Sequence, residues 1–154
     1  MTPQNAPFSQ AEYDRRIALT RAAMAKAGLD AIFVTDPSNQ AWLTGYDGWS
    51  FYVHQGVILT MTGEPHWWGR HMDSLGALRT CWIAPPSIHG YSDSYVQSTV
   101  RHPMQDLARI LRDMHDGVGS HISSAIRQLQ SGKASNDEVL QTLRDSLDQL
   151  KLSI

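Results

Sequence analysis

The chain has 154 residues, of which 42% are hydrophobic and 18% charged, and its formal net charge is −2. This balance is typical of a globular protein and argues against extensive disorder. Without an excess of basic residues, we expect no nucleic-acid partner. Apolar runs are about five residues long, whereas a membrane-spanning helix needs roughly 20, so we expect no membrane association. A single cysteine, Cys81, and a polar start without a signal-peptide core lead us to expect a cytoplasmic protein.

The first part of the chain alternates between helical and strand patterns. Residues 1–8 form a polar leader that we expect to be flexible. The predicted elements that follow are helices over 9–27, 36–43 and 70–79 and strands over 29–35, 48–60, 65–69 and 81–83. Ser9 and Glu12 form a capping box at the start of the first helix, and Gly28 ends it. Residues 9–102 are therefore predicted to form an α/β domain, one central sheet with helices packed against it.

The pattern changes at Pro103. Side chains then step by three and four positions, as in a coiled-coil seam, at Met104, Leu107, Leu111, Met114, Val118 and His121. After a break at Ser131 and Gly132, a second stripe follows at Leu140, Leu143, Leu147 and Leu150. Residues 103–154 are predicted to form an antiparallel two-helix hairpin. Two helices alone bury little area, so we expect the hairpin to pair with that of a second copy and make a homodimer.

His115 and Asp116 lie within the first predicted helix of this hairpin. His115 occupies a position beside the seam, where an imidazole stays accessible, and a phosphate-accepting imidazole needs one free ring nitrogen. The carboxylate of Asp116 is placed to orient the ring or to take up its proton. The alternative is an ordinary surface pair, because histidine followed by aspartate is common in helices.

The longer string around this pair resembles a known family. Residues 112–120, Arg-Asp-Met-His-Asp-Gly-Val-Gly-Ser, are similar to the phosphoacceptor box of nitrate-sensor-type histidine kinases, and residues 143–154 are similar to the second helix of the kinase dimerisation hairpin. The resemblance covers residues 109–154. It implies that His115 accepts a phosphoryl group, with Asp116 as orienting base, and that a kinase domain or response regulator acts in trans as partner. The ATP-binding domain of this family is expected to be absent, so the chain would not phosphorylate itself.

Aromatic residues concentrate between residues 42 and 95, many of them in segments rich in Gly, Asp and Ser. One interpretation is an aromatic core with ordinary loops, and the other is that some rings line a binding surface. The histidines His66, His71, His89 and His102 are 5, 18 and 13 residues apart, which fits no compact metal-ligand pattern. We therefore predict no metal site and no cofactor.

A second resemblance involves this aromatic region. Residues 39–55 (Asn-Gln-Ala-Trp-Leu-Thr-Gly-Tyr-Asp-Gly-Trp-Ser-Phe-Tyr-Val-His-Gln), 69–73, 90–98 and 101–104 are similar to the N-terminal domain of ectoine hydrolases, a branch of the creatinase/prolidase superfamily. This resemblance covers residues 8–113. It implies a ribonuclease-H-like α/β fold that dimerises and lacks the catalytic centre. It also implies that substrate, a small cationic solute such as ectoine with its amidine against tryptophan faces, is contacted by Trp49, Tyr52, His54 and Arg70.

Two functions follow from the two resemblances. In the first, the chain is a non-catalytic fragment or fusion, in which an ectoine-hydrolase-like N-terminal domain without the hydrolase catalytic domain is joined to a kinase-type dimerisation hairpin. In the second, it is a signalling module in which an aromatic ligand-sensing domain controls phosphoryl acceptance at His115. A third possibility is that the chain is only a dimerising structural piece. In none of these cases is the chain expected to be an enzyme on its own. Residues 107–113 suit both resemblances, so we expect the junction there.

Overall fold

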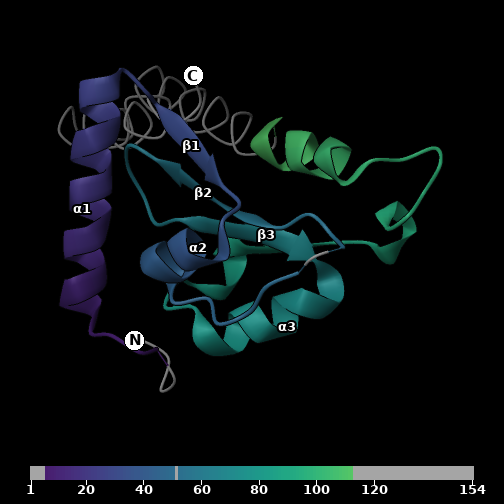
Figure 1. The fold of residues 1–154 in the computed structure, drawn as a ribbon, viewed down its shortest axis with the longest axis horizontal. Coiled ribbons are helices and arrows are strands. Elements are labelled where there is room, and N and C mark those ends of the chain that lie inside the picture. Colours follow the sequence, from purple (N-terminus) through teal and green to yellow (C-terminus); the bar gives the residue numbers. More distant parts are fainter. Residues whose placement is uncertain (1–5, 51, 113–154) are drawn as a thin grey trace, which may run out of the picture.

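The strands form one mixed sheet in the order β1-β2-β3-β4. The computed structural model describes residues 6–50 and 52–112. Its elements are α1 (Gln10–Ala27), β1 (Ala31–Val34), α2 (Pro37–Thr44), β2 (Gly56–Thr60), β3 (His66–Arg70), α3 (His71–Thr80) and β4 (Ile88–Tyr91), with 3-10 turns η1 (Pro85–Ser87) and η2 (Asp93–Tyr95), and residues 103–112 are also helical. β2 pairs antiparallel with β1 and β3, whereas β3 and β4 are parallel and are joined through α3 (Figure 1). The predicted α/β architecture of this part of the chain is confirmed.

Helix α1 begins and ends where the sequence predicts. The Ser9 hydroxyl accepts a hydrogen bond from the Glu12 amide (3.3 Å), and Gly28 ends the helix with a left-handed φ of 68°. The second half of the predicted capping box does not form. The Glu12 carboxylate instead accepts charge-assisted hydrogen bonds from Arg15 and Arg16, each 2.8 Å long, which are stronger than a bond to a neutral amide. These two arginines lower the pKa of Glu12 to about 2.

The predicted strand over 48–60 is too long. Only Gly56–Thr60 pairs as β2, and residues 48–50 and 52–55 form a loop. Within this loop the Ser50 hydroxyl accepts hydrogen bonds from the amides of Tyr52 (3.4 Å) and Val53 (3.2 Å). This local turn competes with strand pairing and shortens the strand.

The predicted strand over 81–83 is wrong, and β4 has no counterpart among the predicted elements. Segment 81–83 packs on α2, where the Trp82 indole donates a hydrogen bond to the Leu43 carbonyl oxygen (2.9 Å). The two prolines of η1 then turn the chain so that β4 can pair with β3. A four-residue strand of mixed polarity carries little periodic signal, and its parallel pairing is non-local.

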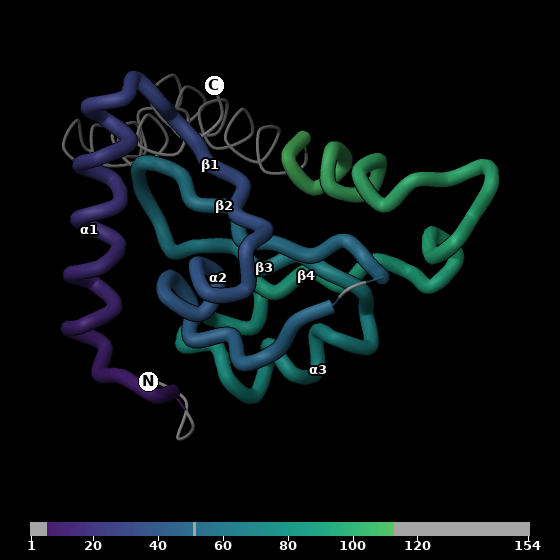
Figure 2. Tube along the Cα trace, in the orientation of Figure 1, coloured from purple at the N-terminus to yellow at the C-terminus, as the bar shows by residue number. Residues whose placement is uncertain are grey.

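Neighbouring residues of the central strands point to opposite faces of the sheet and build two cores. Trp67 and Leu59 pack with residues of α1, α2 and α3 on one face. Trp68 and Ile58 pack on the other face with the helix of residues 103–112. Both tryptophans are 0% exposed. Figure 2 shows this helix on the opposite side of the sheet from α2 and α3.

The helix of residues 103–112 is attached to the sheet by one side of its surface. Leu107 and Ile110 are 7% and 5% exposed, whereas Leu111 is 44% exposed. The Trp68 indole donates a hydrogen bond to the buried carboxylate of Asp106 (3.1 Å). The buried face therefore differs from the predicted seam, because in the described part this helix packs on the sheet of its own chain.

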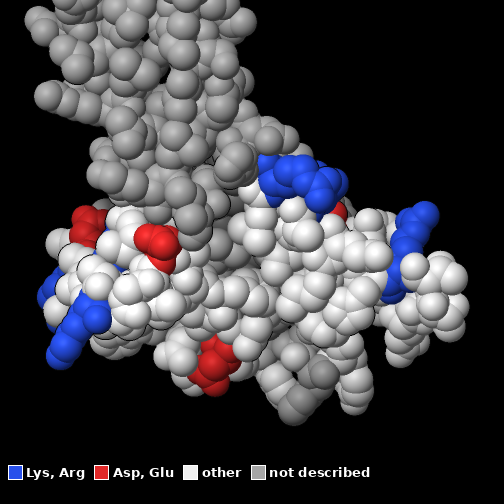
Figure 3. All heavy atoms as spheres, turned by 90° about the horizontal axis from the view of Figure 1, so that it is seen from above, with Lys and Arg blue, Asp and Glu red and all other residues white. Residues whose placement is uncertain are grey.

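The rest of the predicted hairpin, with His115, Asp116 and the leucine stripe, lies outside the described residues. The division of the chain at residue 103 stays a prediction. Seen from above, basic side chains gather over the helix of residues 103–112 (Figure 3). None of the described helices is both long enough and apolar enough to cross a membrane.

Two histidines meet on the Trp68 face of the sheet. His66 Nδ1 and His89 Nε2 are 2.9 Å apart, so one neutral imidazole donates a hydrogen bond to the other. Burial lowers the pKa of both imidazoles. The pKa of His89 falls to about 4, because the neighbouring His66 adds to the effect of burial. Among the other charged groups, Glu64 raises the pKa of His66, while Asp106 raises and Arg109 lowers that of His89.

Leu107→Ala and Leu111→Ala are a matched test of how this helix packs. Removing the buried Leu107 side chain is expected to lower the free energy of unfolding by about 2–4 kcal/mol, whereas the exposed Leu111 should contribute less than about 0.5 kcal/mol. Urea denaturation followed by circular dichroism measures both. An equal loss in the two variants would mean that the predicted seam is buried after all.

The histidine pair predicts a stability that depends on pH. Both imidazoles have a folded-state pKa below the unfolded value of 6.5, so their stabilisation is present above that pH and is lost as the pH falls toward 4. Urea unfolding across this range should show a flatter pH dependence for His89→Gln than for the wild-type chain. The same dependence in both proteins would contradict the assignment.

Candidate functional site

An aromatic loop joins α2 to β2 and is held at its base by two tyrosine hydroxyls. Tyr46, which is 4% exposed, donates a hydrogen bond to Gln55 Oε1 (3.4 Å) and so links the two ends of the loop. The Tyr91 hydroxyl, from β4, donates to the His54 carbonyl oxygen (2.8 Å). Burial raises the pKa of both tyrosines to about 12, so both hydroxyls keep the proton that they donate. The loop formed by residues 46–50 and 52–55 therefore has a fixed base on the sheet.

Between these anchors the loop carries Trp49 and Tyr52 outward. Their exposed fractions are 56% and 88%. Gly48 allows this path, because a Cβ atom there would lie 2.7 Å from the Tyr46 hydroxyl oxygen. Large rings presented to solvent by an anchored loop are typical of a contact surface. For these two rings the structure excludes the alternative of a buried aromatic core.

Arg70 is the last residue of β3, and its side chain is paired with an acidic residue. Its guanidinium forms a bidentate ion pair with Asp93, with distances of 2.7 Å from Nε to Oδ1 and 2.9 Å from Nη2 to Oδ2. The pair raises the pKa of Arg70 and lowers that of Asp93. A substrate contact by Arg70 would therefore have to share or displace Asp93, and the predicted role of Arg70 stays a prediction.

A cavity of about 240 Å³ lies between the loop, β4 and the segment that leads into the helix of residues 103–112. Its wall includes Tyr52 and His54 from the loop, Tyr91 from β4, and Arg101 and His102 from that segment. The His54 and His102 rings meet edge to face, with 4.8 Å between their centroids. The cavity thus combines phenol rings with four nitrogen-bearing side chains, since Gln97 also lines it.

The structure brings together two of the four predicted substrate-binding residues. Tyr52 and His54 line the same cavity, whereas Trp49 and Arg70 are not part of its wall. Sequence reasoning did not select Arg101 as a site residue. The signal was nevertheless present, because residues 90–98 and 101–104 are among the strings on which the ectoine-hydrolase resemblance rests.

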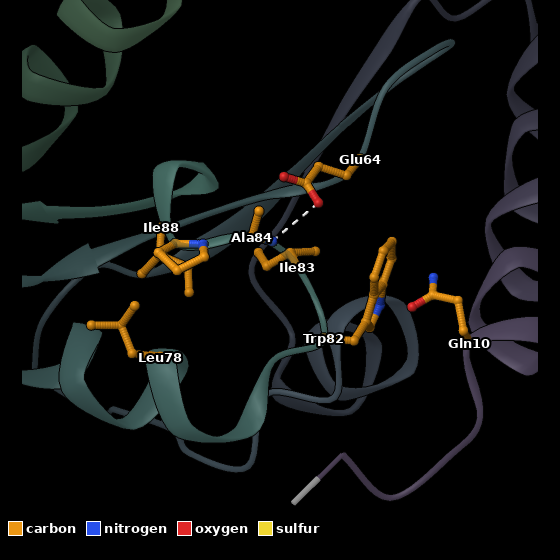
Figure 4. A pocket seen from close by; sticks show the side chains of 8 residues that line it. Gln10, Glu64, Leu78, Trp82, Ile83, Ala84 and Ile88 are labelled. Atoms are coloured by element: carbon orange, nitrogen blue, oxygen red, sulfur yellow. Dashed lines mark hydrogen bonds between the residues drawn. The ribbon is translucent and has the colours of Figure 1, made fainter. Parts of the chain in front are cut away.

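A larger cavity, of about 460 Å³, lies near the start of α1 and the end of α3 (Figure 4). Trp82 and Gln10 are neighbours in its wall, and its charged side chain is Glu64. The Glu64 carboxylate accepts hydrogen bonds from the Ala84 amide (3.1 Å) and the Ser87 hydroxyl (2.5 Å). These bonds fix the turn before β4, so we regard the loop cavity as the stronger candidate site.

The described residues offer groups for binding more than groups for bond breaking. Cys81 is buried, and burial raises the pKa of its thiol to about 12, which removes it as a nucleophile. Within residues 6–50 and 52–112, no cluster of three or more His, Cys, Asp or Glu side chains could hold a metal ion. His115 and Asp116, the predicted phosphoacceptor pair, lie outside the described residues.

Known proteins are similar in sequence to most of this chain. The sequence pattern of the creatinase/prolidase N-terminal domain matches residues 16–130. The chain is 54% identical over 115 residues to the ectoine hydrolase of Halomonas elongata, covering 73% of this chain and 29% of that protein. It is 38% identical over 105 residues to an uncharacterized hydrolase/peptidase of Sinorhizobium fredii, covering 68% and 27%. The chain thus spans less than a third of the length of these curated relatives.

A solved structure shares the fold. A proline dipeptidase from Streptococcus agalactiae matches with a TM-score of 0.51 and 16% identity, covering 62% of this chain and 66% of that one. At this identity the match concerns the fold alone, and it agrees with the α/β architecture described above. None of these matches supports the histidine-kinase resemblance of residues 109–154. The N-terminal domain pattern instead continues through His115 and Asp116 to residue 130.

Proposed function

The chain belongs to the creatinase/prolidase N-terminal domain family, and from this premise we propose that it is the substrate-covering domain of an ectoine-hydrolase-like protein. In this proposal the loop formed by residues 46–50 and 52–55 closes over a small amidine-bearing solute such as ectoine, and the bond-breaking groups lie outside residues 6–112. The observation that carries the proposal is this loop, which is fixed at its base and exposes two large rings. Its presence in a chain 54% identical to an ectoine hydrolase supports the choice of solute.

The exposed rings suit the charge of such a solute. A planar cation is attracted to the face of an indole or phenol ring by about 0.5–2 kcal/mol, and the attraction grows as water is removed. The attraction of the solute to the rings of Trp49 and Tyr52 would therefore be strongest where the loop covers the solute and excludes water. Covering also excludes water from the reacting groups of the other domain, a recognised role of loops that close over active sites.

A covering domain also needs a contact surface toward the rest of its protein. Helix α3 exposes one apolar stripe, formed by Met72, Leu75 and Leu78, which are 58%, 59% and 44% exposed. Exposed stripes of this kind are typical of interaction sites. The stripe supports extending the proposal to contact with another domain or, as in the predicted homodimer, with a second copy of the chain.

A chimeric enzyme tests this proposal. The segment of the Halomonas elongata ectoine hydrolase that aligns with this chain would be replaced by the residues of this chain, and hydrolysis of ectoine would be measured. We expect Trp49→Ala and Tyr52→Ala each to lower kcat/KM by about tenfold or more, because each removes a contact made over the substrate. Leu19→Ala, at a residue of α1 that is 53% exposed, is the control and should leave the rate unchanged. Unaltered rates in both loop variants would contradict the proposal.

Phosphoryl acceptance at His115 stays a prediction from sequence. No described residue bears on it, and the family match extends across the same segment. Incubation with ATP and a histidine kinase of the resembled type, with His115→Gln as the comparison, would decide whether His115 is ever labelled.

A further inference from the structure

The cavity beside the aromatic loop has a basic wall. Of the side chains that line it, four carry nitrogen donors: His54, Gln97, Arg101 and His102. No aspartate or glutamate is among the lining residues. The remaining groups include Tyr91 and Tyr95, whose rings are 6.3 Å apart between centroids and meet edge to face. A cavity lined by both hydrogen-bond donors and phenol rings suits a small ligand that has an anionic group and an apolar or planar body.

The Arg101 side chain, like that of Arg21, has uncharged hydrogen-bond partners within the described part of the chain, whereas other arginines are paired with carboxylates. Arg16, Arg70 and Arg109 each form an ion pair with a carboxylate, at 2.8, 2.7 and 3.1 Å. For Arg101 the recorded partners within the described part are uncharged: the Ser94 hydroxyl accepts a bond from its Nη1 (3.3 Å), and the Tyr95 ring lies 5.8 Å from its Cζ. Figure 3 shows basic surface at the right-hand end of the molecule bordered mainly by uncharged residues.

One ring nitrogen of His102 is a hydrogen-bond acceptor, because it faces a backbone amide. Its Nδ1 accepts a hydrogen bond from the Met104 amide (3.2 Å) at the start of the helix. A neutral imidazole that accepts at Nδ1 carries its proton on Nε2, so His102 retains a donor. Arg101 and His102 both line the cavity, so its wall contains a guanidinium and an imidazole donor.

The backbone of this wall is unusual at one position. Gln97, another lining residue, has a φ of 52°, and it is the only residue other than glycine with positive φ in the described part of the chain. Such a conformation is uncommon for glutamine and recurs at ligand-binding segments, where the surrounding structure maintains it. This observation supports a binding role for the wall without identifying the ligand.

We propose that this cavity binds the carboxylate of a small organic acid, with Arg101 as the charge partner, His102 as a second donor and the tyrosine rings against the body of the acid. A guanidinium matches a carboxylate with two parallel hydrogen bonds, which favours a carboxylate over a spherical anion. The volume of about 240 Å³ is below that of pockets for drug-sized ligands and limits the acid to a small molecule. The site goes beyond the proposed function, because it lies within this chain and requires neither a second domain nor ectoine.

Benzoate and benzamide are matched probes for this site, since they share size and shape and differ in charge. In a titration of the full ¹⁵N-labelled chain, followed by NMR, benzoate is expected to bind at least about tenfold more tightly than benzamide and to shift amides of residues 95–102. Arg101→Gln should weaken benzoate binding by about tenfold or more and leave benzamide binding unchanged. Arg79→Gln, at an exposed arginine on α3, is the control and should bind benzoate like the wild-type chain.

Equal affinity for the two probes, or unchanged benzoate affinity in Arg101→Gln, would overturn the proposal. Arg101 is exposed, so its replacement should leave the unfolding temperature unaltered. Should that variant fail to fold, the comparison of benzoate with benzamide on the wild-type chain still decides. Benzoate binding without any effect of ectoine would support this site and count against the proposed function, so the two can fail separately.

Discussion

Packing of two adjacent tryptophans into opposite faces of one strand is the constraint on which the rest of this molecule depends. Trp67 fills the core beneath α1, α2 and α3, and Trp68 fills the core beneath the helix of residues 103–112. Because side chains alternate along a strand, a shift of β3 by one residue would exchange the two indoles and disrupt both cores. Trp68 also donates a hydrogen bond to Asp106, so the buried carboxylate that holds the helix is not left unpaired.

The Trp68 face also determines where the candidate site lies. Tyr91 packs against Trp68, with 4.8 Å between ring centroids, and its hydroxyl holds the His54 carbonyl at the base of the aromatic loop. On the other side of the cavity, the segment that carries Arg101 leads directly into the helix that Trp68 anchors. Both walls of the cavity are therefore positioned by one core. A substitution in that core is therefore expected to shift the binding groups, although it does not contact them directly.

Local signals made α1 predictable, since Ser9 and Gly28 act within one turn of the helix ends that they define. Strand β4 was beyond such signals, because its identity as a strand comes from parallel pairing with β3, and segment 81–83 looked more like a strand than β4 did. The candidate site, like the fold, could be predicted only in part from local signals. Resemblance predicts Tyr52 as a site residue, and Arg101 stands in one of the resembling strings. No local pattern indicates that the two residues line one cavity, because the sheet topology brings them together. The pairing of Arg70 with Asp93, 23 residues apart, is equally non-local.

In both proposals a small solute binds at the anchored aromatic loop or in the cavity beside it. Such binding is tested most directly by chemical-shift mapping of the ¹⁵N-labelled chain during titration with ectoine, which carries both an amidine and a carboxylate. We expect shifts at the amides of residues 49, 50, 52–55 and 95–102 at millimolar ectoine, with the amides of α1 unaffected. An absence of shifts at both segments, or shifts confined to α1, would contradict such binding.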